Sequence, residues 1–334
     1  MMRMDRYRRG EADTVSDNVS PIPPGVLERV AASAAGVAAV DDLHANIKTH
    51  RARGQRTVLE YRLDGDLRLF VKRYPERGDV LASYEVLRAL WEGGFGPGSR
   101  YRVAEPLGCF AEWGVFVMRV AAGDRLSALA ERTGPWKQGL RAAAGWVARL
   151  HASPVSLGPR EDLAQGVFRL ARRAARAAAH HPELEGVLVR LIEELAERAR
   201  SAGPGSEAQT HGRYHAGHVF VSPETVTVID LDRVARSVPA VDVGEFLHRL
   251  RIPAMRARLG DDATERATLA FVEEYAAQAH GVPDGLVYYW SYSILSTMLR
   301  LLEVDHEKWE KRVEFYRAEF ADVPRRVGTL GGLP

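Results

Sequence analysis

The stretch that decides the fold is residues 211–242, which reads HGRYHAGHVFVSPETVTVIDLDRVARSVPAVD. Two short runs of β-branched and aromatic residues, 219–221 and 226–229, flank residues 222–225, which have proline at the second position. Proline there suits a type I turn, so the segment predicts a β-hairpin. Because an antiparallel hairpin returns to its start, we expect the preceding polar loop and Asp230 at the same end. A carboxylate facing a polar, glycine-containing loop is a workable metal and phosphate site.

The composition is that of an ordinary globular protein, with 334 residues, 46% of them hydrophobic and 27% charged. This length is enough for two lobes and a sizeable core. A net charge of +2 implies neither a nucleic-acid partner nor a membrane surface. The single cysteine, Cys109, excludes an internal disulfide and a cysteine zinc site. The N-terminus lacks the apolar region of a secretory signal, so we expect a cytoplasmic protein.

The N-terminal part of the sequence predicts a tail, two helices and a set of strands. Residues 1–22 are polar and charged, which indicates a disordered tail. A proline opens the predicted helix at 23–34, and apolar spacing predicts another at 79–91. Five strand-like runs are expected in this part of the chain: 44–50, 56–63, 67–74, 101–108 and 115–120.

The pattern from residue 126 onward is helical. Seven further helices are expected: 135–152, 161–180, 182–201, 241–251, 263–280, 284–304 and 306–320. The last eight residues, VGTLGGLP at 327–334, indicate a frayed end.

The loop and hairpin resemble those of the aminoglycoside phosphotransferase family, which shares the protein-kinase fold. The family pattern is His-Gly-Asp-x-His-x-x-Asn, followed by a hairpin and Ile-Asp-Phe/Leu-Asp. The matching residues in this loop and hairpin are His211, Gly212, His215, Asp230 and Asp232, and a later family segment is matched at Asp242, Gly244 and Phe246. Two positions depart and make the catalytic loop degenerate: Arg213 replaces the family's catalytic Asp, and His218 its metal-binding Asn.

The resemblance implies an α+β, bilobal protein-kinase-like fold. A small N-terminal lobe, residues 23–120, would hold an antiparallel sheet with one or two helices and bind nucleotide. A larger, mostly helical lobe, residues 121–325, would carry the catalytic loop and the acceptor pocket. Its helices between 161 and 201 would form an insertion that shapes this pocket. The implied function is an ATP-dependent phosphotransferase that moves the γ-phosphate to a hydroxyl of a small molecule or natural product.

The resemblance also implies the nucleotide-binding residues. Lys72 maps to the family's phosphate-binding lysine and Glu85 to its helix partner, while Met118 and Val120 map to the hinge segment beside adenine. Lys72 alternates with apolar strand residues, where an unpaired ammonium is costly. The alternatives are a surface lysine, a surface glutamate and an apolar core strand. The turn at 48–56, KTHRARGQR, is either a phosphate-covering loop or a plain solvated hairpin tip.

The expected cofactors are ATP and Mg²⁺, with Mn²⁺ possible. Asp230 supplies the hard oxygen ligand that Mg²⁺ on ATP needs. Asp232 could hold a second metal ion or tie down a water or backbone group. His218 could ligate a metal, for which imidazole suits Mn²⁺ better than Mg²⁺, or it could hydrogen-bond Asp230 or a phosphate.

Proton transfer is the open question at the loop, because the guanidinium of Arg213 stays protonated and cannot act as a base. His215 or His211 could take over, and Arg213 could grip the γ-phosphate or an acidic acceptor. His211 could instead be structural, and Arg213 could form a salt bridge to Asp230 or Asp232 that blocks the metal site. The alternative function is therefore a catalytically impaired pseudokinase that binds nucleotide, peptide or a partner in a biosynthetic pathway.

The expected partners are a small-molecule or peptide acceptor, with a protein partner or a homodimer possible, and no nucleic acid or membrane. Four carboxylates stand in or beside the C-terminal helices: Glu273, Glu274, Glu303 and Asp305. Five arginines offset them: Arg249, Arg251, Arg256, Arg258 and Arg300. This balance argues against a strongly cationic acceptor.

Overall fold

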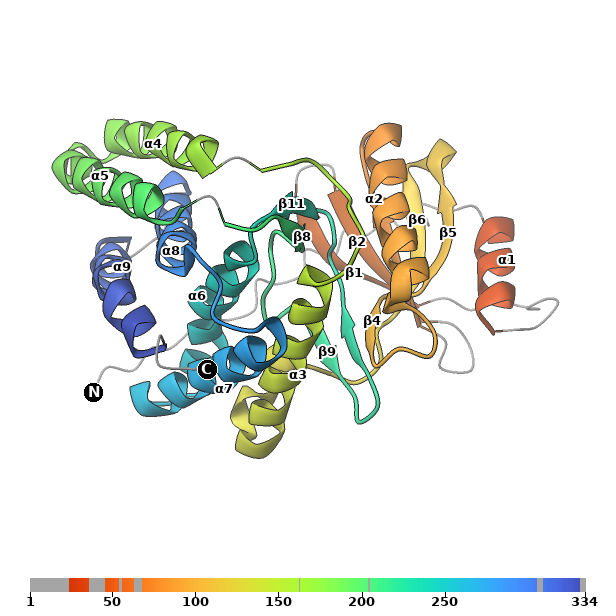
Figure 1. The fold of residues 1–334 in the computed structure, drawn as a ribbon. Helices are drawn as coiled ribbons and strands as arrows, with labels where there is room; N and C mark the ends of the chain where they lie inside the picture. The colour runs from red at the N-terminus through yellow and green to blue at the C-terminus, as the bar shows by residue number, and fades with distance from the viewer. Residues whose placement is uncertain are drawn as a thin grey trace. The chain divides into compact units, whose positions relative to one another are not determined.

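The computed structural model describes residues 24–35, 46–53, 56–62, 68–161, 163–203, 205–304 and 309–330. It has an α+β fold, with an antiparallel sheet toward the N-terminus and a larger helical part after it (Figure 1). The chain divides into two units. One comprises the chain up to Gly98 with Val103–Ala121, and the other comprises Ser99–Arg102 with Ala122–Pro334. The tail expected at 1–22 lies outside the described residues.

The described part of the first unit holds an antiparallel sheet of five strands in the order β1-β2-β3-β6-β5. Its strands are β1 Asn46–Arg53, β2 Arg56–Arg62, β3 Arg68–Arg73, β5 Pro106–Phe110 and β6 Val115–Arg119. The single strand expected at 101–108 was wrong, because the structure divides it between β5 and β4 (Tyr101–Val103), which joins a different sheet.

The turn expected at 48–56 was also wrong in extent. Strand β1 pairs with β2 as far as the partners Arg53 and Arg56, so most of this basic segment is strand. Gly54, the glycine of the expected loop, lies outside the described residues. The segment therefore offers little chain for a loop that would cover phosphates.

Two helices cover the sheet of the first unit, α1 (Pro24–Ala35) and α2 (Arg77–Leu90). Figure 1 shows β5 and β6 between them. The core on the α1 side consists of Val26, Val30, Leu59, Tyr61, Leu69, Val71, Val115 and Val117. Helix α2 packs against the other face, where the rings of Tyr84 and Phe116 lie 6.0 Å apart. Strand side chains alternate between faces, so the two helices bury alternate residues of β3 and β6.

Two small sheets in the second unit frame the loop that follows β8. One has the order β4-β10-β9-β7, and the other pairs β8 with β11. Their strands in this unit are β7 Asp124–Arg125, β8 Ala208–Thr210, β9 Val219–Val221, β10 Val226–Val228 and β11 Ala235–Ser237. The antiparallel β9–β10 pair confirms the predicted hairpin.

Each of the seven helices expected after residue 126 is present in the described part of the second unit. They are α3 Thr133–His151, α4 Leu163–His180, α5 Glu185–Ser201, α6 Ala240–Arg256, α7 Asp261–Ala279, α8 Leu286–Glu303 and α9 Trp309–Leu330. The frayed end expected from 327 was wrong as far as Leu330. That side chain is buried with Phe320 and Val323, and this apolar face keeps α9 helical.

A column of stacked rings ties the loop to three helices. Trp146 of α3 stacks on Tyr214 of the loop at 5.6 Å, and Tyr214 stacks on Phe246 of α6 at 5.2 Å. Phe246 stacks in turn on Phe271 of α7 at 4.0 Å. The Tyr214 hydroxyl donates to the Ala143 carbonyl at 2.8 Å, which satisfies its one buried polar group. The loop is thus fixed to the helical core.

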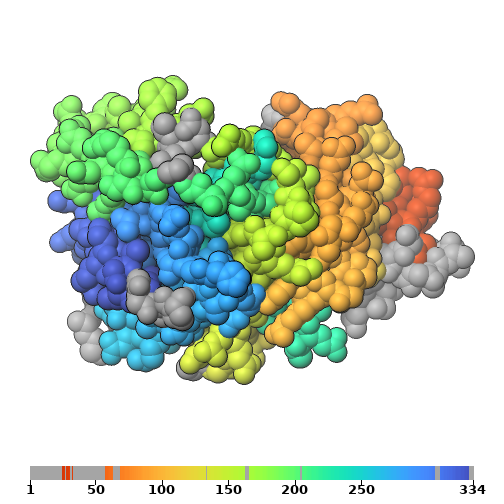
Figure 2. Space-filling view, in the orientation of Figure 1, coloured from red at the N-terminus to blue at the C-terminus, as the bar shows by residue number. Residues whose placement is uncertain are grey.

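The α4–α5 pair packs against α8, and α8 packs against α9. In the space-filling view the green surface of α4 and α5 adjoins the blue surface of the C-terminal helices (Figure 2). None of the helices in the described part of the chain combines the length and the hydropathy of a membrane-spanning helix.

Candidate functional site

The β9–β10 hairpin brings His218 and Asp230 together. Its pairing continues beyond the strands, because the Ile229 N–H donates to the His218 carbonyl at 3.0 Å. The turn is closed by the Ser222 N–H, which donates to the Thr225 carbonyl at 2.9 Å. At the open end, Nε2 of His218 lies 3.1 Å from Oδ2 of Asp230. The expectation that the hairpin delivers the loop and Asp230 to one end is confirmed.

The two ring nitrogens of His218 have different roles. Nδ1 lies 3.1 Å from the Arg213 carbonyl, which can only accept, so Nδ1 carries a hydrogen. Nε2 then faces the Asp230 carboxylate, and two such acceptors repel unless a proton or a metal ion binds between them. Burial lowers the pKa of His218 to about 4, although its hydrogen bond to Asp230 raises it. The His218 ring is therefore neutral near neutral pH.

The backbone of Asp230 is in the left-handed region, with φ of 68°. This conformation is uncommon for residues other than glycine, although Asp and Asn adopt it more readily than most. It costs on the order of 1–3 kcal/mol and persists where the surroundings fix it, often at functional sites. Here it occurs at the residue that leaves the hairpin next to His218.

Asp242, at the start of α6, anchors the loop. Its Oδ2 accepts from the His211 N–H at 2.7 Å, and its Oδ1 accepts from the Gly212 N–H at 2.8 Å. Nε2 of His151 lies 3.1 Å from the same carboxylate. The side chain is fully buried. The sequence marked Asp242 only as a family match, and its role was missed, because these contacts join residues about thirty positions apart.

Gly212 is required where Asp242 holds the backbone. Its φ is 73°, and a Cβ atom there would lie 2.1 Å from the carbonyl oxygen of Arg233. Any side chain at this position would push the loop away from the segment after the hairpin. The glycine thus allows the close approach that lets both loop amides reach one carboxylate.

His211 is fully buried and has the contacts of a structural residue. Its Nε2 donates to the Ile229 carbonyl at 3.1 Å, which links the loop to the hairpin. Its Nδ1 is buried without a hydrogen-bond partner among the described residues. This geometry favours the structural alternative, and a catalytic role for His211 stays a prediction.

His215 is poorly suited to accept a proton. Its Nδ1 accepts from the Gly217 N–H at 3.0 Å, which leaves the hydrogen of the neutral ring on Nε2. Burial lowers its pKa far below the usual value, and the nearby charges of His218 and Arg249 lower it further. The neutral ring can therefore donate a hydrogen bond but has no lone pair left for a substrate proton. Its catalytic role stays a prediction.

Of the three residues expected to bind metal, the structure brings two together, His218 and Asp230. No group of three or more His, Cys, Asp or Glu side chains converges as a metal site in the described ranges. His218 and Asp230 supply two adjacent donor atoms, one nitrogen and one oxygen. Asp232 is half-buried, and its role as a ligand stays a prediction.

Lys72 and Glu85 belong to the first unit. Lys72 is only 6% exposed and lies opposite Phe116 of β6 in the sheet register. Phe116 contacts Tyr84, the neighbour of Glu85 on α2, so Lys72 lies on the sheet face that α2 covers. A buried ammonium needs an anionic partner or ligand. The pairing of Lys72 with Glu85 stays a prediction.

The expected hinge lies at the end of β6. Met118 is buried in that strand, opposite Phe70 of β3. The Val120 N–H donates to the Arg68 carbonyl at 3.0 Å, so this amide is already used by the sheet. The assignment of Met118 and Val120 to nucleotide binding stays a prediction.

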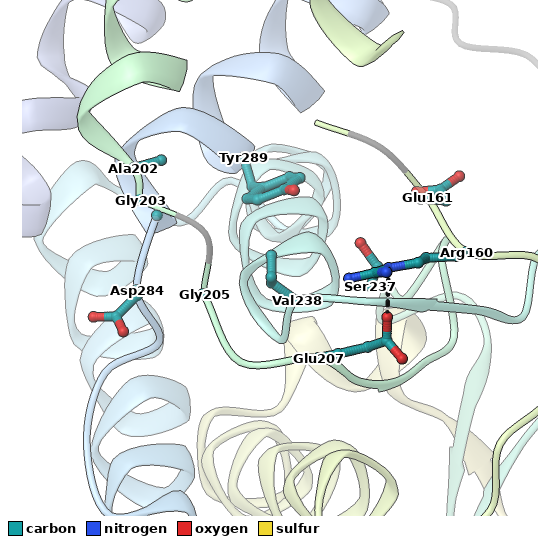
Figure 3. A pocket seen from close by; sticks show the side chains of 11 residues that line it. Arg160, Glu161, Ala202, Gly203, Gly205, Glu207, Ser237, Val238, Asp284 and Tyr289 are labelled. Carbon is teal, nitrogen blue, oxygen red and sulfur yellow. Dashed lines mark ion pairs between the residues drawn. The ribbon is translucent and has the colours of Figure 1, made fainter. Parts of the chain in front are cut away.

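A pocket of about 410 Å³ in the second unit lies away from this loop. Its lining includes Arg160, Glu207 and Ser237, and Figure 3 shows the ion pair between Arg160 and Glu207. Glu207 precedes β8 whereas His211 follows it, and a strand of three residues spans about 10 Å. Neither His218 nor Asp230 lines the pocket. It is therefore separate from the candidate site.

We expect acid to destabilise the protein in part through His248. Burial is the main cause that lowers the pKa of this histidine, 5% exposed on α6, to about 4 from 6.5. The unfolded chain therefore takes up the proton first, and the free energy of unfolding falls as the pH drops from 6.5 toward 4. The loss by pH 4.5 is about 2–3 kcal/mol.

The variant His248→Gln tests this expectation, because glutamine can keep the bond to Thr297 Oγ1, which lies 2.9 Å from Nε2. Urea unfolding at pH 7 and pH 4.5 measures the free energy of unfolding at each pH. The difference between the two values should be smaller in the variant than in the wild type by about 2–3 kcal/mol. An unchanged pH dependence would contradict the assignment.

The chain is similar to known phosphotransferases in both sequence and structure. The family model described as "Phosphotransferase enzyme family" matches residues 50–286. A choline/ethanolamine kinase family protein from Mesorhizobium loti is similar in structure, with TM-score 0.56, 16% identity, and coverage of 90% of this chain and 94% of that one. Choline kinase from Cryptosporidium parvum has TM-score 0.60 and 11% identity, with coverage of 87% of this chain and 92% of that one. Amicoumacin kinase, solved with AMP-PNP, has TM-score 0.61 and 13% identity, with coverage of 90% of this chain and 94% of that one. No curated protein matches the sequence significantly. At these low identities the structural similarity shows a shared kinase-like fold and nothing more specific.

Proposed function

Because the chain belongs to the phosphotransferase enzyme family, we propose that it transfers the γ-phosphate of ATP to a hydroxyl group of a small molecule. The observation that carries this proposal is the approach of His218 and Asp230 at the open end of the hairpin, within the matched region. The neighbours named as choline and amicoumacin kinases are consistent with a small-molecule acceptor.

The donor set at the hairpin fits a divalent metal ion. Oδ2 of Asp230 and Nε2 of His218 are 3.1 Å apart, close to the spacing of two adjacent ligands about 2.1 Å from an octahedral metal. The Nδ1–H of His218 donates to a backbone carbonyl, which orients Nε2 as the metal-binding nitrogen. A nitrogen and oxygen pair favours Mn²⁺ over Mg²⁺. A bound ion would neutralise charge on the nucleotide phosphates.

The other residues of the loop do not remove a proton. Their role is to orient the substrates and to neutralise charge on the phosphates. Phosphoryl transfer passes through a loose transition state, so it depends mainly on orientation and charge. The guanidinium of Arg213 supplies permanent positive charge beside the metal-binding pair, and its own carbonyl holds His218. Lys72 of the first unit supplies the ammonium for the donor phosphates. The missing carboxylate base costs ~10²–10⁴ in rate, which slows transfer without abolishing it.

A second candidate function is nucleotide binding without transfer. It is favoured by the chemistry of the loop, where Arg213 cannot accept a proton and neither nitrogen of the neutral His215 ring has a free lone pair for one. In this case Asp230 and Lys72 would still serve the nucleotide. The two candidates differ in transfer and agree on binding.

Nucleotide binding and transfer are tested together on the full chain. With ATP and Mn²⁺, we expect binding by calorimetry and slow phosphate transfer to a member of a panel of hydroxylated small molecules. Lys72→Met should weaken binding by about tenfold or more, since a charge-assisted contact contributes ~1.5–3 kcal/mol. The exposed Arg73→Met on the same strand is the matched control. Binding without transfer to any acceptor would favour the second candidate, and absence of binding would overturn both.

A further inference from the structure

Four arginines from separate elements of the second unit gather beside the loop. They are Arg213 of the loop, Arg249 of α6, Arg300 of α8 and Arg173 of α4. Partial burial lowers the pKa of the Arg300 guanidinium, and the positive charges of the other three lower it further. Tyr214, the neighbour of Arg213, stacks on Phe246 of α6 at 5.2 Å, and Arg249 stands one turn after Phe246, so the group extends to the loop. We call these four residues the arginine cluster.

Contacts between α6 and α8 place two members of the cluster. His248 of α6 is joined to Thr297 of α8, with Nε2 2.9 Å from Oγ1. Arg249 follows His248 directly and forms an ion pair with Glu245, one turn earlier on α6. Arg300 stands one turn after Thr297 on α8. The two guanidiniums therefore extend from neighbouring turns of two packed helices.

Arg173 reaches the same surface of α8 from α4. Its guanidinium donates to Ser296 Oγ at 3.1 Å and to both carboxylate oxygens of Glu303 at 2.8 and 3.0 Å. Ser296 lies one turn before Arg300 and Glu303 lies one turn after it. Arg173 thus runs along α8 beside Arg300. Helix α4 therefore contributes to the same cluster as the loop.

The cluster has more positive than negative charge. Glu245 binds Arg249, and Glu303 binds Arg173. Arg300 is only partly buried and makes no ion pair with any carboxylate among the described residues. Guanidinium groups do not lose their protons in proteins, so this excess remains at every physiological pH. Like charges held together are unfavourable unless an anion binds among them, and guanidinium matches phosphate and carboxylate with two hydrogen bonds.

The cluster also adjoins the proposed reaction site. The Arg213 carbonyl accepts from His218, and His218 contacts Asp230, so the chain of contacts runs from the metal-binding pair to Arg213. We infer that the acceptor is an anion: a hydroxyl compound that also carries a phosphate or carboxylate group, which the arginine cluster binds. This inference rests on the proposed function, since it names the acceptor of the same loop. A cationic acceptor would be repelled here.

The test titrates inorganic phosphate, and separately succinate, into the full chain saturated with a non-hydrolysable ATP analogue. Saturable heat is expected for at least one of them, and the two arms separate a phosphate site from a carboxylate site. Arg300→Gln should weaken that binding by about tenfold or more, because a charge-assisted hydrogen bond is lost. Arg300→Lys should retain part of the affinity. Arg266→Gln, at an exposed arginine of α7, is the matched control and should leave it unchanged.

Several outcomes would overturn the inference. The first is equal anion affinity in the wild type and in Arg300→Gln. The second is loss of anion binding once the analogue is bound. The third is that neither phosphate nor succinate binds. In the second case the cluster would serve the donor phosphates. The analogue is titrated first, so its failure to bind reports on the proposed function alone. The anion titration of the analogue-free protein still tests the cluster in that event.

Discussion

Asp242→Asn should lower the free energy of unfolding by about 3–5 kcal/mol, the usual cost of breaking a buried charged network. The carboxylate accepts from the backbone amides of His211 and Gly212 at 2.7 and 2.8 Å and also contacts His151. Asparagine has one accepting oxygen, so its amide nitrogen would face a donor in the fully buried site. Urea unfolding followed by the fluorescence of buried Trp146 measures the loss.

The matched control is Asp262→Asn, at an exposed aspartate near the start of α7. It should change the free energy of unfolding by less than about 0.5 kcal/mol, as surface substitutions usually do. A loss of less than about 1 kcal/mol for Asp242→Asn would contradict its anchoring role. The prediction concerns folding alone and is independent of the proposed activity.

The elements that the sequence predicted well are those with a local signal. The hairpin depends on two short β-branched runs and the Ser222–Thr225 turn, and its register follows from the turn. Each long helix has an apolar repeat that is read within its own residues. The division of the 101–108 segment could not be read in this way. The Trp146 indole donates to the Arg102 carbonyl at 2.8 Å, a contact across 44 residues that ties β4 to helix α3.

The site shows the same contrast between local and distant contacts. His218 and Asp230 were expected together because one hairpin joins them, and the structure places them 3.1 Å apart. The arginine cluster draws on α4, α6 and α8, so no spacing along the chain marks it. From the sequence alone, only an overall balance of arginines and carboxylates near the C-terminus could be stated. Tertiary packing decides which of these charges meet beside the loop.

Asp230→Asn should abolish Mn²⁺ binding and reduce phosphate transfer by on the order of 10²–10³-fold. A bound metal ion contributes several kcal/mol of charge stabilisation in the transition state, and each 1.36 kcal/mol is tenfold in rate. Asparagine tolerates the left-handed backbone of Asp230, so the hairpin should stay folded. Binding is measured by the loss of the electron paramagnetic resonance signal of aqueous Mn²⁺, a readout that needs no turnover.

His218→Asn separates the nitrogen ligand from the carboxylate and should have a different effect. An amide oxygen replaces the imidazole, so the preference should move from Mn²⁺ toward Mg²⁺ by about tenfold in relative affinity. Competition of Mg²⁺ against bound Mn²⁺ in the same resonance experiment measures the ratio. If His218 were only a hydrogen-bond partner of Asp230, the ratio would match the wild type while Asp230→Asn still lost the metal. A shifted ratio in one variant and lost binding in the other is the pattern that a mixed nitrogen and oxygen site requires.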